Sequence, residues 1–137
     1  RPAELLQAKI NKVDGILCFD LTDVSIKVKN SNSRRTVPIH SKLLPIVDEI
    51  ETVINKYKTV KVISRNTTKA LRELGLPSTS TLYSLRHTFI TNMIKLGADV
   101  NIVSSIVGHS LQGNKMTLGV YFKGYDMRKL KETIELL

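Results

Sequence analysis

The spacing of hydrophobic and polar positions changes along the chain near residue 41. Before that point, short apolar or alternating runs are separated by polar turn residues, a pattern typical of strands. Three such runs, at residues 15–21, 24–30 and 34–40, predict a small antiparallel sheet. Beyond it, apolar residues recur every three or four positions, which indicates helices. The predicted fold class is therefore α+β, mainly helical, with helices packed against a three-stranded antiparallel sheet near the N-terminus.

Residues that start and stop helices divide the chain into elements. Pro2, in a first turn, opens a helix that we predict over residues 1–10. Pro45 is tolerated in the first turn of a helix over residues 41–57, because the N–H that it lacks would have no partner there. Glycines or polar loops are expected to bound the later helices, at residues 66–75, 81–97, 99–108, 116–124 and 126–137.

Composition narrows the class of partner. The 137 residues, enough for one compact domain, include 21 Lys plus Arg and 12 Asp plus Glu, a net charge of +9. This charge favours a polyanion through attraction and counterion release, with nucleic acid as the first candidate and an anionic membrane surface as the second. No apolar run is long enough to span a bilayer or resembles a signal peptide. We therefore expect a soluble, cytoplasmic protein that acts on nucleic acid and not at a membrane.

The single cysteine, Cys18, cannot form an internal disulfide and lies in an apolar run that is typical of a strand. A buried structural thiol is its expected role. Because there are only one Cys and three His, no closed zinc site is expected either.

Arg86 interrupts the apolar face of the helix predicted over residues 81–97. That face is formed by residues at three- and four-residue spacing, Leu82, Leu85, Phe89 and Met93. An unpaired guanidinium in an apolar setting is costly, by roughly several kcal/mol. Either a carboxylate of the protein pairs with Arg86, or an anion from outside the protein does.

Other candidate site residues each have a structural alternative. His109 follows a glycine at the end of a predicted helix, where a histidine is more often a cap or a surface residue. Tyr121 and Tyr125 lie four residues apart on one helical face, where packing is the ordinary role. Four further basic residues are either solvated surface or phosphate contacts, namely Arg34, Arg35, Arg65 and Lys69.

Taken together and in this order, the residues resemble a known enzyme family. The run SLRHTFITNMIKLGADVNIVSSIVGHS followed by MTLGVY resembles the C-terminal catalytic domain of the tyrosine recombinase, or phage integrase, family. The family's pattern is His-x-x-Arg with a following helix, then Gly-His, then a tyrosine after a short loop. Arg86, His109 and Tyr121 match this pattern, and the resemblance covers essentially the whole chain.

The N-terminal part of the chain resembles the rest of the family's pattern. RPAELLQAKI is similar to the family's opening Arg-x-x-Glu-Leu helix, which would make Arg1 the first catalytic arginine and Glu4 the glutamate that accompanies it. KNSNSRRTVP places Lys29 where relatives carry a catalytic lysine in the turn of a β-hairpin. The resemblance thus implies an integrase-like catalytic core.

One position departs from the pattern. Tyr83 stands three residues before Arg86, where the family usually has histidine. A phenol can hydrogen-bond a phosphate, but it is a poor base near neutral pH. The neighbouring His87 points about 100 degrees away around the helix, so we expect a structural role for it.

The resemblance implies a mechanism without a metal or another cofactor. Arg1 and Arg86 would clamp the non-bridging oxygens of a phosphodiester, and His109 would donate a third hydrogen bond. Tyr121 would attack phosphorus to give a 3′-phosphotyrosyl link, and Lys29 would protonate the departing 5′ oxygen. The role of Tyr83 would be to contact the same phosphate.

The resemblance also implies a biological setting. The protein would be a site-specific recombinase of a prokaryote or phage that acts on double-stranded DNA as a homotetramer, with accessory DNA-bending proteins. Residues 1–137 would be its catalytic domain, a fragment that lacks an N-terminal core-binding domain. The apolar strip of the helix at residues 126–137 would dock into a neighbouring protomer or pack onto its own domain.

Two other functions fit part of the pattern. A type IB topoisomerase uses two arginines, a lysine, a histidine and a tyrosine to nick and reseal DNA without exchange of partners. A DNA-binding module without catalysis could use the two helices on either side of Gly97 as a helix-turn-helix. The second function leaves Arg86 in its apolar stripe without an explanation.

Overall fold

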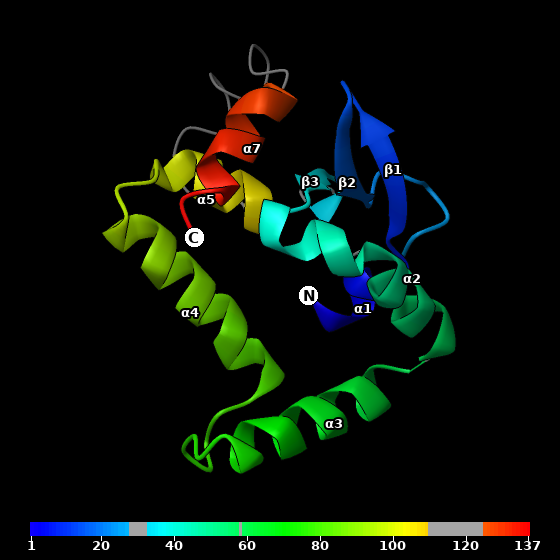
Figure 1. Ribbon diagram of the computed structural model, residues 1–137, viewed down its shortest axis with the longest axis vertical. Helices are drawn as coiled ribbons and strands as arrows, with labels where there is room; N and C mark the ends of the chain where they lie inside the picture. Colours follow the sequence, from blue (N-terminus) through cyan, green and yellow to red (C-terminus); the bar gives the residue numbers. More distant parts are fainter. Residues whose placement is uncertain (28–32, 58, 110–124) are drawn as a thin grey trace.

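The computed structural model of the protein describes residues 1–27, 33–57, 59–109 and 125–137 (Figure 1). The described part is mainly helical with one three-stranded antiparallel sheet, which confirms the predicted class and is compatible with an integrase-like fold. Its elements are helix α1 (Pro2–Leu5), strands β1 (Lys9–Val13), β2 (Ile16–Asp20) and β3 (Thr36–Pro38), the 3-10 helix η2 (Ser41–Ile46), and helices α2 (Val47–Lys56), α3 (Val60–Glu73), α4 (Leu82–Lys95), α5 (Val100–Val107) and α7 (Met127–Ile134).

The first hairpin corrects the predicted N-terminal helix. β1 and β2 pair antiparallel, with Val13 opposite Ile16. Between them, Asp14 and Gly15 have φ angles of 50° and 80°. Positive φ at both turn residues is the type I′ conformation that Asp-Gly favours. The prediction of a helix over residues 1–10 is therefore wrong beyond α1, because the hairpin draws the end of that segment into a strand.

The prediction of a strand at residues 24–30 is wrong for residues 24–27, the part that the structure describes. The Asp23 carboxylate accepts hydrogen bonds from the backbone N–H and the hydroxyl of Ser25, at 2.8 and 2.7 Å. Such local bonds form turns in competition with a sheet ladder. The chain therefore turns here and packs Ile26 against Ala8 and Leu21. β3 pairs directly with β2, so the sheet has the order β1-β2-β3.

The predicted helix boundaries at α2 and α3 also shift. The helix predicted over residues 41–57 divides into η2 and α2, with Pro45 inside η2. α3 begins at Val60, earlier than predicted, and Gly75 follows its end with a φ of 74°. The stop signal was thus recognisable in the sequence, whereas the start was not, because no side chain caps this helix.

α4 and α5 meet at a short turn that orients the candidate site. Asp99 caps α5, accepting hydrogen bonds from two amides of its first turn at 2.7 and 3.2 Å. α5 ends at Gly108, whose φ is 68°. The amides of Gly108 and His109 close the last turn by bonding to carbonyls three and five residues earlier. None of the helices in the described part is long and apolar enough to cross a membrane.

The main core cluster lies between the sheet, α5 and α7, which Figure 1 shows side by side. Its buried members are Cys18, Ile102, Ile106, Met127, Leu130 and Ile134. Burial raises the pKa of the Cys18 thiol, whose residue is 0% exposed. The prediction of a buried structural cysteine is therefore confirmed.

α7 packs onto its own domain, which is the second of the two alternatives for its apolar strip. At its far end, Glu135 accepts hydrogen bonds from the backbone N–H and hydroxyl of Ser41 at 2.8 and 2.6 Å. Lys131 Nζ donates to the Ile39 carbonyl at 2.6 Å and pairs with Glu135. These bonds hold α7 against the segment that follows β3.

Glu135 makes this contact pH-dependent. Hydrogen bonds from Lys131 and then Ser41 lower the pKa of Glu135 from 4.5 to about 2. A carboxyl whose pKa is lower in the folded state stabilises the fold above its unfolded pKa, and this contribution disappears as pH falls through the folded pKa. We expect Glu135→Gln to lower Tm at pH 7 and to flatten the decline in Tm between pH 4.5 and 2. Thermal unfolding across this range measures both effects, and an unaltered slope would contradict the assignment.

Candidate active site

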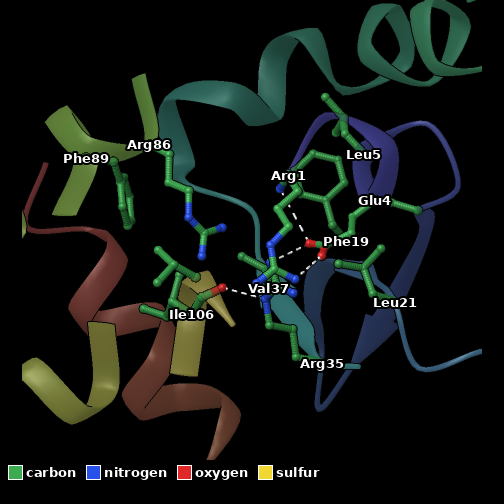
Figure 2. A pocket seen from close by; sticks show the side chains of 12 residues that line it. Arg1, Glu4, Leu5, Phe19, Leu21, Arg35, Val37, Arg86, Phe89 and Ile106 are labelled. Atoms are coloured by element: carbon green, nitrogen blue, oxygen red, sulfur yellow. Dashed lines mark hydrogen bonds and ion pairs between the residues drawn. The ribbon is translucent and has the colours of Figure 1, made fainter. Parts of the chain in front are cut away.

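A pocket of about 230 Å³ lies between α1, the sheet, α4 and α5 (Figure 2). Three arginines line it, Arg1, Arg35 and Arg86, and Glu4 is the one carboxylate among its described lining residues. The rest of the lining is apolar and consists of Leu5, Ala8, Phe19, Leu21, Val37, Phe89, Ile106 and Val107. Three guanidiniums and one carboxylate leave an excess of two positive charges in apolar surroundings. Such a pocket suits an anionic ligand.

Arg86 reaches from α4 into this pocket (Figure 2). Its Nε and Nη2 atoms are buried and have no hydrogen-bond partner among the described residues. Desolvation by burial, followed by the positive charges of Arg1 and Arg35, lowers the pKa of Arg86. The lining carboxylate, Glu4, is already paired with the other two arginines. Within the described part of the chain, Arg86 therefore has two donors that an anion from outside can use.

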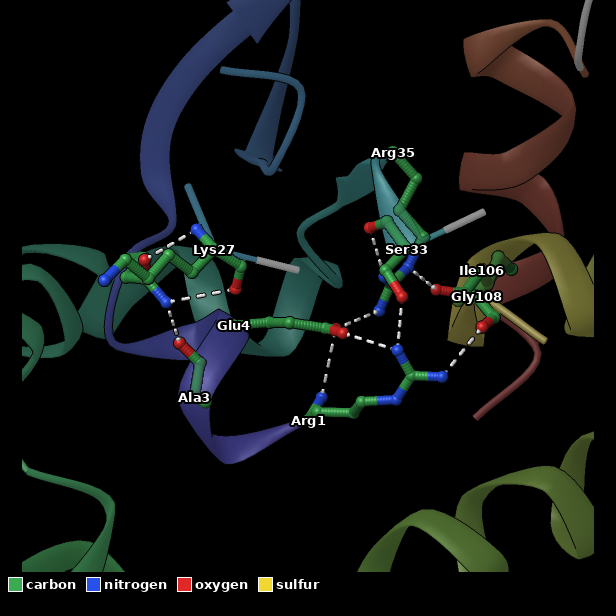
Figure 3. Close-up of polar contacts among 9 residues, drawn as sticks. Arg1, Ala3, Glu4, Lys27, Ser33, Arg35, Ile106 and Gly108 are labelled. Carbon is green, nitrogen blue, oxygen red and sulfur yellow. Dashed lines mark hydrogen bonds and ion pairs between the residues drawn. The ribbon is translucent and has the colours of Figure 1, made fainter. Parts of the chain in front are cut away.

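Arg1 and Arg35 share the buried carboxylate of Glu4 (Figure 3). Arg1 Nη1 lies 2.8 Å from Oε1, and Arg35 Nη2 lies 3.1 Å from Oε2. Burial alone would raise the pKa of Glu4, but the charge of Arg35 and the hydrogen bonds from both arginines lower it. Arg1 also donates to the Ser33 hydroxyl and, at 3.2 Å, to the Gly108 carbonyl. These contacts hold the Arg1 guanidinium at the edge of the pocket.

His109 follows the last turn of α5 and is exposed. Desolvation by neighbouring atoms, and then the positive charges of Arg86 and Arg1, lower the pKa of its imidazole. The neutral form is thereby favoured, and it can donate one hydrogen bond from a ring N–H. The resemblance places His109 and Arg86 in one site, and the charge of Arg86 acts on the His109 imidazole.

Tyr83 is not brought into the pocket. It lies one turn before Arg86 on α4, its residue is 52% exposed, and it is absent from the pocket lining. Its ring meets that of His87 edge to face, with centroids 4.9 Å apart and planes at 76°. The structural role expected for His87 stays a prediction, and this ring contact is compatible with it.

Two predicted site residues lie outside the described residues. Lys29 belongs to the connection between β2 and β3, and Tyr121 belongs to the segment between α5 and α7. The structure thus brings together Arg1, Glu4 and Arg86 around one pocket, with His109 beside it. The roles of Lys29 and Tyr121 stay predictions.

Arg35 is a pocket residue whose position sequence reasoning missed. The sequence predicts either solvated surface or a phosphate contact for Arg35, as it does for Arg34. In the structure, Arg34 donates to backbone carbonyls of residues 22–26, whereas Arg35 enters the pocket. Adjacent residues entering a strand point to opposite sides. The doubled arginine before β3 was therefore a signal that one of the two faces inward.

Comparison with known proteins finds relatives of one kind. A tyrosine recombinase of Pseudothermotoga lettingae is 26% identical over 132 residues, which cover 88% of this chain and 45% of the relative. The tyrosine recombinase XerD of Staphylococcus epidermidis is 28% identical over 131 residues, covering 78% of this chain and 44% of the relative. The tyrosine recombinase XerC of Mesorhizobium japonicum is 30% identical over 74 residues, or 54% and 22% of the two chains.

The chain spans less than half the length of each of these relatives. No family model and no solved structure matches it. The similarity to several tyrosine recombinases, which reaches over most of the chain, supports its membership of the tyrosine recombinase family.

Proposed function

We propose that the protein is a site-specific DNA recombinase that cleaves and rejoins DNA strands through a 3′-phosphotyrosyl intermediate. The observation that carries this proposal is the Arg86 guanidinium, which lies in an arginine-lined pocket with two buried donors unpartnered among the described residues. A phosphodiester is the anion that fits a protein with a net charge of +9 and relatives named recombinases.

In this mechanism, Arg1 and Arg86 bind the two non-bridging oxygens of the scissile phosphate, and His109 donates a further hydrogen bond. The Tyr121 phenol loses its proton to solvent and its oxygen bonds to phosphorus as the bond to the 5′ oxygen breaks, and Lys29 supplies the proton to that oxygen. Attack by a phenolate gives the pentacoordinate transition state a second negative charge. The two excess positive charges of the pocket offset it, and the apolar walls strengthen the attraction.

Attack by a 5′ hydroxyl on the phosphotyrosyl link reverses these steps and joins the strand to the same or a new partner. The energy of the phosphodiester is retained in the covalent link, so joining requires no ATP. Residues 1–137 act as the catalytic domain of this enzyme, and exchange between two DNA duplexes uses a homotetramer, with accessory DNA-bending proteins as further partners.

A type IB topoisomerase would use the same chemistry, and the names of the relatives favour a recombinase over it. A helix-turn-helix module is disfavoured by α5, which would be its recognition helix. α5 carries no Lys or Arg, and half of its eight residues are buried. A recognition helix instead needs exposed side chains that reach the bases.

The proposal is tested with a pool of nicked suicide duplexes of randomised sequence, in which cleavage releases a short strand that cannot be rejoined. We expect a protein–DNA adduct that survives denaturation, attached at a 3′ end, and enriched for one sequence. Addition of a second duplex should then give joined strands from two molecules. Absence of any adduct, or attachment at a 5′ end, would contradict the proposal, and resealing without exchange would indicate the topoisomerase.

A further inference from the structure

Arg35 joins three parts of the chain that border the candidate site (Figure 3). Its Nη2 pairs with Glu4 of α1 at 3.1 Å. Its Nε donates to the carbonyl of Ile106, in the last turn of α5, at 2.7 Å. Its Nη1 donates to the carbonyl of Ser33, in the connection before β3, at 2.7 Å. One side chain thus ties α1 and the end of α5 to the sheet.

The two arginines that face each other across the pocket differ in how their donors are used. All three nitrogens of Arg35 have a partner within the protein, and its side chain is 12% exposed. Arg86, by contrast, keeps Nε and Nη2 without a partner in the described part of the chain. Arg35 is therefore suited to hold the site together, whereas Arg86 is suited to bind a ligand.

Gly108 provides the space in which the Arg35 guanidinium lies. A Cβ atom at Gly108 would come within 2.6 Å of Arg35 Nη1 and 2.9 Å of Cζ, closer than real Cβ contacts. The Gly108 carbonyl also accepts the hydrogen bond from Arg1 Nη2. Gly108, which directly precedes His109, thus lies against both Arg1 and Arg35.

We propose that Arg35 is a positioning residue for strand cleavage, which sets Arg1 and His109 at a fixed separation around the phosphate. It acts on Arg1 through Glu4, and on His109 through the last turn of α5. The inference rests on the proposed function, since it assigns a role within the same site.

The sharing of Glu4 gives the physical reason. Arg35 Nη2 pairs with Oε2, which the Arg1 α-amine also reaches at 3.4 Å, so the Arg1 guanidinium contacts only Oε1, through Nη1. Without Arg35, both carboxylate oxygens are available to Arg1, and an arginine prefers such a bidentate pair. The Arg1 guanidinium would then turn toward Glu4 and away from the phosphate. The end of α5 would at the same time lose the donor that holds the Ile106 carbonyl.

Two variants and a matched control test this role in the intact protein. Arg35→Lys keeps the charge, but one ammonium cannot reproduce the planar fork that reaches three acceptors. Gly108→Ala keeps every charged group and displaces the Arg35 guanidinium by contact. Gly75→Ala is the control, because Gly75 has a similar φ of 74°, also ends a helix, and has nothing within 4 Å of its Cβ position. It reports the backbone strain alone.

We expect Arg35→Lys and Gly108→Ala each to slow single-turnover cleavage of suicide DNA by about 100-fold, the effect of an error near 1 Å in the placement of reacting groups. The Kd for DNA should change by less than about threefold, because the donors of Arg35 are already used within the protein. The double variant should cleave no more slowly than the slower single variant, since both act on one contact. Gly75→Ala should cleave as the parent does.

Cleavage by Arg35→Lys at the parent rate would overturn the proposal. So would a loss of DNA affinity as large as the loss of cleavage, because Arg35 would then be a phosphate ligand. Amide hydrogen exchange at His109, measured without DNA, separates this proposal from the proposed function. We expect about tenfold faster exchange in both variants, the change expected when roughly one hydrogen bond at a helix end is weakened. If the parent forms no covalent adduct, the recombinase proposal fails, and unaltered exchange in both variants overturns the positioning role as well.

Discussion

Arg86→Ala should abolish DNA cleavage, with a loss of at least about 10³-fold at saturating DNA, while the domain stays folded. Removal of a preorganised donor that stabilises transition-state charge in a water-excluded site typically slows the reaction by a factor of this order. The fold should tolerate the change, because Nε and Nη2 of Arg86 have no partner within the described part of the chain. The free energy of unfolding should therefore change by less than about 1 kcal/mol. Single-turnover cleavage and thermal unfolding measure the two effects.

Arg86→Lys should not restore cleavage, since an ammonium lacks the fork that engages two phosphate oxygens. Arg72→Ala is a suitable control for the loss of a positive charge. Arg72 donates to the carbonyls of Pro77 and Ser78, away from the pocket. Cleavage that survives in Arg86→Ala, or a domain that unfolds, would show that Arg86 serves an internal ion pair instead.

Tyr121→Phe should bind DNA as the parent does and yield no covalent adduct, because only the attacking oxygen is removed. Tyr125→Phe is the matched control four positions along the sequence. Tyr125 is half-buried against the core that joins the sheet, α5 and α7. Desolvation, and then the charge of Asp99, raise the pKa of Tyr125, which disfavours the nucleophilic phenolate. Its variant should still form the adduct.

Gel analysis of denatured reactions compares the two variants, and mass spectrometry of a digested adduct locates the nucleotide. Tyr121 follows His109 at the distance that the tyrosine recombinase pattern leads us to expect, although it lies outside the described residues. A nucleotide attached to the peptide at Tyr125 would overturn this assignment.

Local signals in the sequence were sufficient for the end of α3 and for both ends of α5. Asp99 and Gly108 bound α5, and Gly75 follows α3, because caps and left-handed glycines act on groups within a few residues. Asp14-Gly15 is a turn signal of the same local kind, yet the residues before it are predicted to lie in a helix. The apolar residues of that short segment suit either period, so only pairing with β2 decides between them.

The strand predicted at residues 24–30 is a second case in which a local pattern was not sufficient. Alternation at residues 24–30 predicted a strand, but the carboxylate of Asp23 bonds to Ser25 and turns the chain. The order of strands in a sheet depends on which backbone groups find partners across the whole domain. A pattern within seven residues does not contain that information.

The sequence by itself determined the mainly helical class, the excess of positive charge, and the order of Arg86, His109 and Tyr121 that resembles tyrosine recombinases. Those properties depend on composition and on spacings of a few residues. Only the tertiary structure decided that Glu4 also pairs with Arg35, that Arg86 keeps two donors without a partner in the described part of the chain, and that α7 packs onto its own domain. These contacts join groups far apart in the sequence, such as Arg35 and Ile106, 71 positions apart, and Arg1 and Gly108, 107 positions apart. Which of the distant arginines pairs with the buried Glu4 carboxylate depends on how α1, the sheet and α5 pack together. Local spacing in the sequence does not determine that pairing.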